Sequence, residues 1–136
     1  MRPILLDTNA YSDFMQGVAD IVEIIAKADR IYLSSTVLGE LLSGFAVGKR
    51  AAQNRLELTK FLCSPRVAIA SVTDTTADFY ATIYANLRRK GRPIPTNDMW
   101  IAASTMEHGA ILITRDSHFA HIENLRTGQN PADIMP

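Results

Sequence analysis

Residues 4–14 read ILLDTNAYSDF, which is three apolar residues, one aspartate and then small polar residues. A short apolar run without polar alternation is typical of a strand that is buried on both faces of a parallel sheet. Asp7 follows that run, at the carboxyl end of the predicted strand. Sites in open parallel sheets lie at the carboxyl ends of their strands. The stretch therefore predicts both a fold class and the place of its site.

The rest of the chain alternates short apolar runs with longer segments of helical periodicity. Further strand-like runs are RIYLS at 30–34, RVAIAS at 66–71 and AILIT at 110–114. The segments of helical periodicity are one that ends at about residue 28, followed by 36–45, 49–62, 75–89 and 97–108. Strands that alternate with helices predict an α/β fold with three layers, α/β/α, and a central, mainly parallel sheet.

Several residues mark where these elements begin and end. Thr75 and Asp78 have the spacing of a capping box at the start of a helix. Gly91 and Gly109 stand where helices are expected to end. The tail TGQNPADIMP, residues 127–136, reads as a loop.

Composition narrows the class of protein. A chain of 136 residues with 47% hydrophobic content predicts a single domain over residues 1–136. The 14 basic and 14 acidic residues balance, which argues against coating of nucleic acid or lipid by bulk charge. The single cysteine, Cys63, excludes an intramolecular disulfide and fits a reducing compartment. With no apolar run near the ~18 residues of a membrane span, we expect a cytoplasmic protein.

Three further carboxylates stand at places comparable to that of Asp7. Asp116 follows the strand-like run 110–114, and Asp98 lies at the start of the helical segment before that run. Glu40 lies early in the helical segment after 30–34. In a parallel sheet these positions gather at the carboxyl ends of the strands.

Each carboxylate also has a purely local explanation. Asp7 and Asp116 can cap the helix or turn that follows them. The negative charge of Asp98, in the first turn of its helix, can interact favourably with the helix dipole. Glu40 is harder to explain locally, because apolar residues surround it in the sequence and it is therefore expected to face inward.

Convergence of the four acids favours a shared site over four separate local roles. Two carboxylates about 5 Å apart repel by roughly 3 kcal/mol at an effective dielectric constant near 20. A bound divalent cation removes that penalty, and hard oxygen ligands suit Mg²⁺ or Mn²⁺. Such a site can activate water for attack on phosphorus. The acids thus indicate phosphodiester hydrolysis.

The motifs, taken in order, resemble those of the PIN-domain nucleases, and most closely the VapC toxins of bacterial toxin–antitoxin pairs. The motifs are DTN at 7–9, Glu40, Asn97-Asp98, and Thr114-Arg115-Asp116 with Phe119. DTN alone is a weak signal, but the whole series in this order and spacing is a specific one. The resemblance covers nearly the whole chain, from Ile4 to the last predicted strand.

The resemblance implies a metal-dependent endoribonuclease. Its acidic quartet, holding Mg²⁺ or Mn²⁺, is then Asp7, Glu40, Asp98 and Asp116. The supporting polar residues are Thr8, Asn9, Asn97 and Thr114. The family typically forms homodimers and is inhibited by a VapB-like antitoxin that occupies the acidic groove. RNA is the implied substrate, and tRNA is a common target of such toxins.

Other features carry weaker signals. RRKGR at 88–92 supplies candidate contacts to the RNA backbone, namely Arg88, Arg89, Lys90 and Arg92. The alternative is a solvated helix end, whose cations complement the helix dipole. His118 and His121 have a spacing that can bind metal, but the absence of a nearby cysteine or third histidine disfavours zinc.

Two other classes of α/β protein also place acids at strand ends. A phosphatase of the haloacid dehalogenase type needs a second aspartate where Asn9 stands, and a receiver domain needs an acidic pair and a late lysine. A PIN-like binding module without catalysis remains the alternative. The apolar segments 36–45 and 75–87 are candidates for a dimer or antitoxin contact.

Overall fold

The protein is described here by a computed structural model of residues 2–136, at whose centre lies a five-stranded sheet. The strands are β1 (Ile4–Leu6), β2 (Ile31–Ser34), β3 (Val67–Ala70), β4 (Ile111–Ile113) and β5 (Thr127–Gly128). Their spatial order is β3-β2-β1-β4-β5, and every neighbouring pair is parallel. Strand β1 lies in the middle, with Ile4 opposite Ile31 of β2 and Ile111 of β4. The predicted parallel sheet is therefore confirmed.

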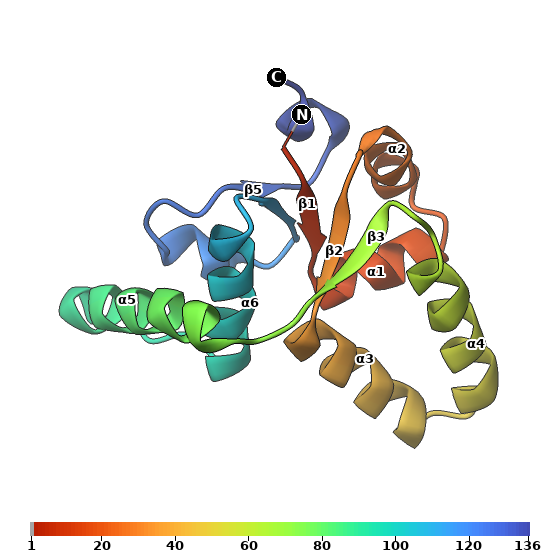
Figure 1. The fold of residues 1–136 in the computed structure, drawn as a ribbon, viewed down its shortest axis with the longest axis horizontal. Coiled ribbons are helices and arrows are strands. Elements are labelled where there is room, and N and C mark those ends of the chain that lie inside the picture. The colour runs from red at the N-terminus through yellow and green to blue at the C-terminus, as the bar shows by residue number, and fades with distance from the viewer. Residues whose placement is uncertain (1) are drawn as a thin grey trace.

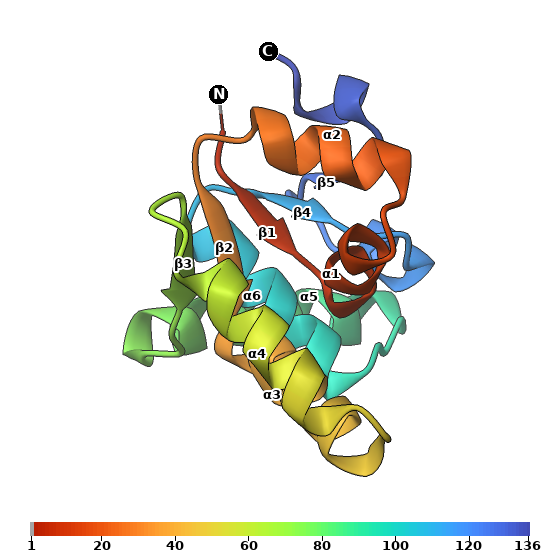
Figure 2. The same ribbon diagram turned by 90° about the vertical axis from the view of Figure 1, so that its right-hand side faces the viewer.

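Helices cover both faces of this sheet. They are α1 (Thr8–Met15), α2 (Ala19–Lys27), α3 (Ser35–Val47), α4 (Ala51–Leu62), α5 (Asp74–Lys90) and α6 (Thr96–Glu107). Two 3₁₀ turns follow, η1 (Ser117–His121) and η2 (Pro131–Ile134). Helices α5 and α6 lie on one side of the central strands, and α1, α2 and α4 lie on the other (Figure 1). The view at 90° agrees, with α4 in front of α6 (Figure 2). This is the expected three-layer α/β/α architecture.

The central strands form the core. All three residues of β1, together with Leu112 and Ile113 of β4, have 0% of their surface exposed. Burial of an aliphatic side chain stabilises the fold by about 1.5–3 kcal/mol. Both faces of these strands are covered by helices, so the sequence needs apolar residues at every position rather than at alternate ones.

Several element boundaries differ from the sequence prediction. The segment that ends near residue 28 is two helices, α1 and α2, separated at residues 16–18. The capping box at the start of α5 joins Thr73 and Thr76, so the predicted box at Thr75 and Asp78 is wrong. Helix α5 begins at Asp74 because the Thr73 backbone N–H already has a partner in the Thr76 hydroxyl.

The tail is more ordered than the sequence predicted, and its description as a loop is wrong. Residues 127–128 add a fifth strand beside β4, and η2 packs against α2 with Ile134 only 2% exposed. Asn130 and Asp133 form a capping box that starts η2. Both predicted helix-ending glycines are confirmed, since Gly91 and Gly109 have φ of 65° and 60°. Among the helices described, none combines the length and the apolar character needed to cross a membrane.

Candidate active site

The four predicted acids come from four places around the carboxyl end of the sheet. Asp7 follows the last residue of β1, and Asp116 follows β4 as the cap of η1. Glu40 lies in α3, which begins directly after β2, and Asp98 lies in the first turn of α6. Helices α1 and α3 both start at this end of the central strands (Figure 1). Parallel strands and short connections thus bring four acids that are far apart in the sequence to the same end of the sheet.

Asp7 is nearly enclosed, with 5% of its surface exposed. Its Oδ1 accepts the backbone N–H of Thr8 at 2.8 Å and caps α1. Its Oδ2 accepts the Thr114 hydroxyl at 2.7 Å and the Asn9 amide at 3.1 Å. The local capping role is therefore real, and it leaves the second carboxylate oxygen for contacts that cross the site.

Glu40 links three helices at this end of the sheet. Its Oε1 accepts the Thr8 hydroxyl at 2.5 Å, and its Oε2 accepts the Asn97 amide at 3.3 Å. The side chain therefore points toward α1 and α6 rather than into the apolar core. Thr8 and Asn97, both expected as supporting residues, hold it in that orientation.

Asp98 and Asp116 meet around His118, which the sequence did not connect with them. His118 Nδ1 lies 3.1 Å from Oδ2 of Asp98 and 3.2 Å from Oδ1 of Asp116. One ligand atom from each of the three residues falls within 4.8 Å of the other two. The Asp98 side chain is 13% exposed, and that of His118 is 51% exposed, so the group opens to solvent on the histidine side.

From the sequence, His118 was considered only together with His121, as a disfavoured zinc pair, and these two contacts were missed. The histidines separate because the His121 backbone carbonyl accepts a bond from Lys90, while the His118 ring turns to the acids. The position of His118 two residues after Asp116 was the available signal. It was insufficient because the contact with Asp98 depends on how α6 packs beside η1.

Electrostatics agree with convergence of the acids. Burial is the main cause that raises the pKa of Asp7, and the charges of Glu40 and Asp116 raise it further, while the Thr114 and Thr8 hydrogen bonds oppose the rise. Burial also raises the pKa of Asp98, and the charges of Asp116 and Asp7 add to that effect. All four acids therefore lie within electrostatic reach of at least one other.

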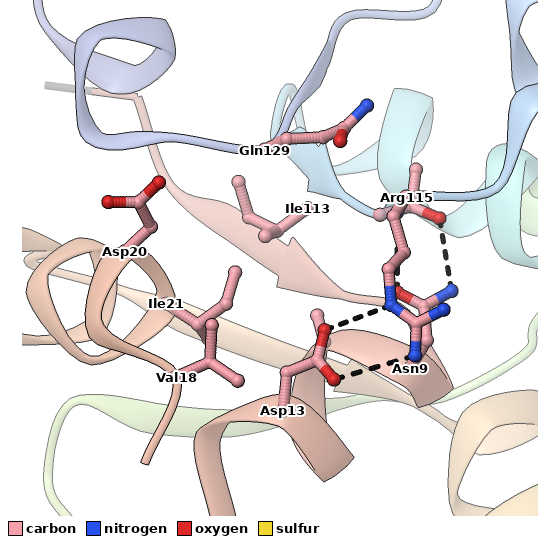
Figure 3. A pocket seen from close by; sticks show the side chains of 10 residues that line it. Asn9, Asp13, Val18, Asp20, Ile21, Ile113, Arg115 and Gln129 are labelled. Atoms are coloured by element: carbon pink, nitrogen blue, oxygen red, sulfur yellow. Dashed lines mark hydrogen bonds and ion pairs between the residues drawn. The ribbon is translucent and has the colours of Figure 1, made fainter. Parts of the chain in front are cut away.

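A polar network fixes the loop that carries Asp116. The Thr114 hydroxyl accepts the backbone N–H of Asp116 at 3.0 Å, and the Asn9 side-chain oxygen accepts that of Arg115 at 3.3 Å. Arg115 forms an ion pair with Asp13, with Nε to Oδ2 at 3.1 Å, and both line the pocket of Figure 3. Asp13 was not singled out in the sequence, and its contact requires α1 and the loop after β4 to be neighbours.

The donor set fits a divalent cation. Two carboxylates and one imidazole offer ligand atoms to a shared, partly solvated space, where burial and the charge of Asp116 raise the pKa of Asp98 and the His118 hydrogen bond opposes that rise. Asp7 and Glu40 already accept bonds from neighbouring donors, which suits contact with an ion through water. Asp98 and Asp116 are the residues best placed for direct ligation.

The basic cluster at 88–92 divides into two groups. Lys90 forms an ion pair with Glu123 at 3.1 Å, which draws it away from the acids. Arg88 and Arg92 instead line a groove that reaches Thr96 at the start of α6. Only this second group is oriented toward the helix that carries Asp98.

Comparison with known proteins agrees with this geometry. A family profile described as PIN domain matches residues 4–125. The chain is 32% identical to Ribonuclease VapC2 of Rickettsia felis over 126 residues, which covers 89% of this chain and 92% of that protein. The solved structure of VapBC2 from Rickettsia felis, bound to a promoter DNA fragment, has a chain that superposes with a TM-score of 0.80 at 29% identity, covering 93% of this chain and 97% of that one. A chain of VapBC-1 from nontypeable Haemophilus influenzae gives 0.82 at 26% identity, covering 96% and 98%.

Proposed function

This chain belongs to the PIN-domain family, and from that premise we propose that it is a VapC-type toxin, an endoribonuclease that hydrolyses RNA phosphodiester bonds in the cytoplasm. One observation carries the proposal: Asp98 and Asp116 offer ligand atoms to one space, and burial together with the charges of Asp116 and Asp7 raises the pKa of Asp98. Relatives that match most of the chain are named ribonucleases, which supports the same reaction. The unit that acts is the whole described chain, as one PIN-like domain.

We propose Mg²⁺ or Mn²⁺ as the cofactor. Such an ion, when bound, supplies Lewis acidity that lowers the pKa of a water and neutralises charge on the phosphate. Asp98 and Asp116 are the proposed direct ligands, while Asp7 and Glu40 complete the site directly or through water. Mutual repulsion of buried carboxylates supports this assignment, since a cation relieves it.

The supporting residues set the orientation of the acids. Thr114 and Asn9 hold Oδ2 of Asp7, and the hydrogen bond from Thr114 lowers the Asp7 pKa and so favours the ionised form. Thr8 and Asn97 hold the two oxygens of Glu40, which we propose accepts a proton from, or orients, the attacking water. Preorganisation of this kind positions a reacting group without reorganisation during the reaction.

The RNA backbone is proposed to cross the groove beside the start of α6. Arg88 and Arg92 line that groove and can contact phosphates without reading sequence. The other two cations of the cluster, Arg89 and Lys90, are the weaker candidates because Glu123 lies beside them. We propose tRNA as the first substrate class to test.

We also propose a VapB-like antitoxin as a partner. Solved chains that superpose on this one come from VapBC complexes of Rickettsia felis, Haemophilus influenzae and Salmonella typhimurium. A cationic segment laid over the acids would relieve their repulsion as a metal ion does. Homodimerisation is proposed through α3 and α5, where Leu38 and Leu42 are half-buried and Tyr84 is 45% exposed.

The test is cleavage of total cellular RNA by the purified, partner-free protein. Reactions contain Mg²⁺, Mn²⁺ or EDTA, beside Asp7→Asn protein whose folding is verified by thermal unfolding. Discrete fragments that need metal and disappear in Asp7→Asn support the nuclease. An absence of cleavage by folded protein under every metal would favour the alternative, a catalytically silent PIN-like scaffold.

A further inference from the structure

We propose that His118 binds the divalent ion directly through Nδ1, as a third ligand beside Asp98 and Asp116. This nitrogen ligand shifts the preference of the site from Mg²⁺ toward Mn²⁺ and other first-row transition ions. The inference rests on the proposed function, because it takes the ion to sit between these two acids. It adds to that function a residue and a metal class that an all-carboxylate site would lack.

Distances among the three ligand atoms match the edges of a coordination shell. In an octahedral site with bonds of about 2.1–2.2 Å, neighbouring ligand atoms lie roughly 3.0–3.1 Å apart. His118 Nδ1 lies 3.1 Å and 3.2 Å from the nearest oxygens of Asp98 and Asp116. All three atoms fall within 4.8 Å of one another, which also accommodates two ligands on opposite sides of an ion. Two of the three pairs of ligand atoms are therefore already spaced as neighbours in a coordination shell.

The local fold holds the imidazole in this position. Asp116 caps η1 by accepting the backbone N–H of His118 at 2.9 Å, which fixes the turn on which the ring stands. The next residue, Phe119, is 1% exposed and anchors the turn in the core. Because the His118 side chain remains 51% exposed, water and substrate can still reach the ion from the open side.

The identity of the donor atoms determines which metal is favoured. Carboxylate and water suit Mg²⁺, Ca²⁺ and Mn²⁺, whereas imidazole suits the later first-row ions such as Fe²⁺, Ni²⁺ and Zn²⁺. Mn²⁺ is itself a first-row transition ion and accepts a nitrogen ligand more readily than Mg²⁺ does. Mg²⁺ keeps oxygen ligands and several waters, so a nitrogen donor adds little to its binding. An imidazole in the shell therefore strengthens Mn²⁺ binding more than Mg²⁺ binding.

The same distances also fit a simpler arrangement, in which His118 donates a hydrogen bond and only orients the acids. The substitution His118→Gln separates the two roles, because a glutamine amide still donates a hydrogen bond but offers no imidazole nitrogen. His121→Gln is the matched control, because His121 lies on the same turn and its hydrogen bond to Lys90 is made by its backbone carbonyl.

The first experiment is pulsed electron paramagnetic resonance of the full protein with one equivalent of Mn²⁺. We expect ¹⁴N modulation from a bound imidazole in the wild type and in His121→Gln, and its loss in His118→Gln. Modulation that is absent from Mn²⁺-loaded wild type, or unchanged in His118→Gln, overturns the proposal.

Calorimetric titration of Mn²⁺ and Mg²⁺ gives a second readout that is independent of activity. We expect His118→Gln to weaken Mn²⁺ binding by about tenfold or more and Mg²⁺ binding by less than about threefold. Equal weakening of both metals contradicts the proposal. If wild-type protein cleaves RNA but shows no nitrogen ligand on Mn²⁺, this inference is wrong and the proposed ribonuclease function still stands. A wild type that binds neither metal and cuts no RNA removes both.

Discussion

Asp7 shows that a local role and a role in a site need not exclude each other. One oxygen caps α1 through Thr8, and the other takes the Thr114 hydroxyl. The sequence offered capping and ligation as alternatives, whereas the two oxygens of a carboxylate allow both. A capped, hydrogen-bonded acid is also held in a single orientation, which a ligand requires.

Replacement of Asp98 by asparagine is expected to stabilise the metal-free protein and to inactivate it. Burial and neighbouring charges raise the Asp98 pKa, so the ionised form at neutral pH opposes folding. Asparagine removes the charge and keeps an oxygen for His118. We expect the Tm in EDTA at pH 7 to rise by about 2–5 °C, or roughly 1 kcal/mol, and RNA cleavage to fall at least about 100-fold.

Differential scanning calorimetry and a cleavage assay measure the two effects. Asp29→Asn, at an exposed position, is the control and should shift the Tm by less than about 1 °C. A lower Tm for Asp98→Asn than for the wild type would mean that the charge at residue 98 is compensated within the protein.

The pH dependence of stability follows from the same raised pKa values. An acid with a raised folded-state pKa binds its proton more tightly when folded, so its protonation stabilises the fold. The contribution from Asp7 and Asp98 is therefore largest below their ordinary pKa of 3.8 and is lost as pH rises through the raised values. Glu123 and Asp133 act oppositely, because their lowered pKa values give stability that is lost at lower pH.

Urea unfolding in EDTA should consequently show a stabilising contribution from Asp7 and Asp98 that grows as pH falls from neutrality toward 3.8, while Glu123 and Asp133 oppose it in acid. The double variant Asp7→Asn/Asp98→Asn should lose most of this contribution. A wild type whose unfolding free energy changes with falling pH in the same way as that of the double variant would contradict the electrostatic description of the site.

Thr114 supplies one hydroxyl to three partners in the site. It donates to Asp7, and it accepts from the backbone of Asp116 and, at 3.4 Å, from Asn9, while only 4% of its surface is exposed. Thr114→Val removes the partner of the Asp116 backbone N–H and one of the two donors to Oδ2 of Asp7. We expect a loss of about 1–3 kcal/mol in the free energy of unfolding and a cleavage rate about tenfold or more below wild type.

Thr114→Ser keeps the hydroxyl and should retain most of the free energy of unfolding and most of the cleavage rate. Equal behaviour of the valine and serine variants in urea unfolding and in the cleavage assay would show that the hydroxyl does not position Asp7.

At the scale of elements, sequence patterns predicted four of the strands, β1 to β4, and most of the helices. Strands β1 and β4 are read easily because every residue is apolar and buried, whereas β2 and β3 are mostly apolar but less fully buried. Strand β5 is two residues long, too short for any periodic signal, and η2 is held by tertiary packing of Ile134 beside α2. Such packing between residues distant in the chain leaves no trace in local sequence.

The tail can be tested at Gly128. A Cβ atom at this position would lie 2.8 Å from Cβ of Asp133, so Gly128→Ala must displace η2 from β5. We expect a loss of roughly 1–3 kcal/mol in the free energy of unfolding. Gly44→Ala, inside α3 where an added Cβ meets nothing within 4 Å, should instead be neutral or stabilising by about 0.5–1 kcal/mol.

Both variants are measured by urea unfolding. Equal stability of Gly128→Ala and wild type would show that the tail contributes little to the fold.

At the scale of the whole molecule, the site is assembled from residues that are far apart in the chain. The four acids were identified from their places relative to predicted strands, a rule that follows from parallel topology. That His118 would meet Asp98 could not be predicted, because the contact depends on the angle at which α6 approaches η1. The division of the basic cluster likewise depends on Glu123, which follows η1 and lies next to the end of α5.

That division predicts which cations bind RNA. The double variant Arg88→Ala/Arg92→Ala removes the two charges that line the groove next to Thr96. We expect weaker RNA binding in EDTA, and a slope of log K against log salt that is shallower by roughly 1–1.5. Lys90→Ala is the control, since Lys90 is already paired with Glu123. Fluorescence anisotropy at several salt concentrations measures both, and a larger effect from Lys90 would place the RNA on another surface.

The chemistry of the RNA ends left by cleavage tests the central claim most directly. Water activated at an acidic metal site attacks phosphorus, so the products should carry a linear phosphate at one end and a hydroxyl at the other. Mass spectrometry of an RNA cut by wild type in Mn²⁺ is expected to show only such ends, and Asp116→Asn should yield no products. Fragments that end in a 2′,3′-cyclic phosphate and persist in EDTA would show attack by the ribose hydroxyl without metal. That result would contradict the assignment of Asp7, Glu40, Asp98 and Asp116 as a metal-dependent hydrolytic site.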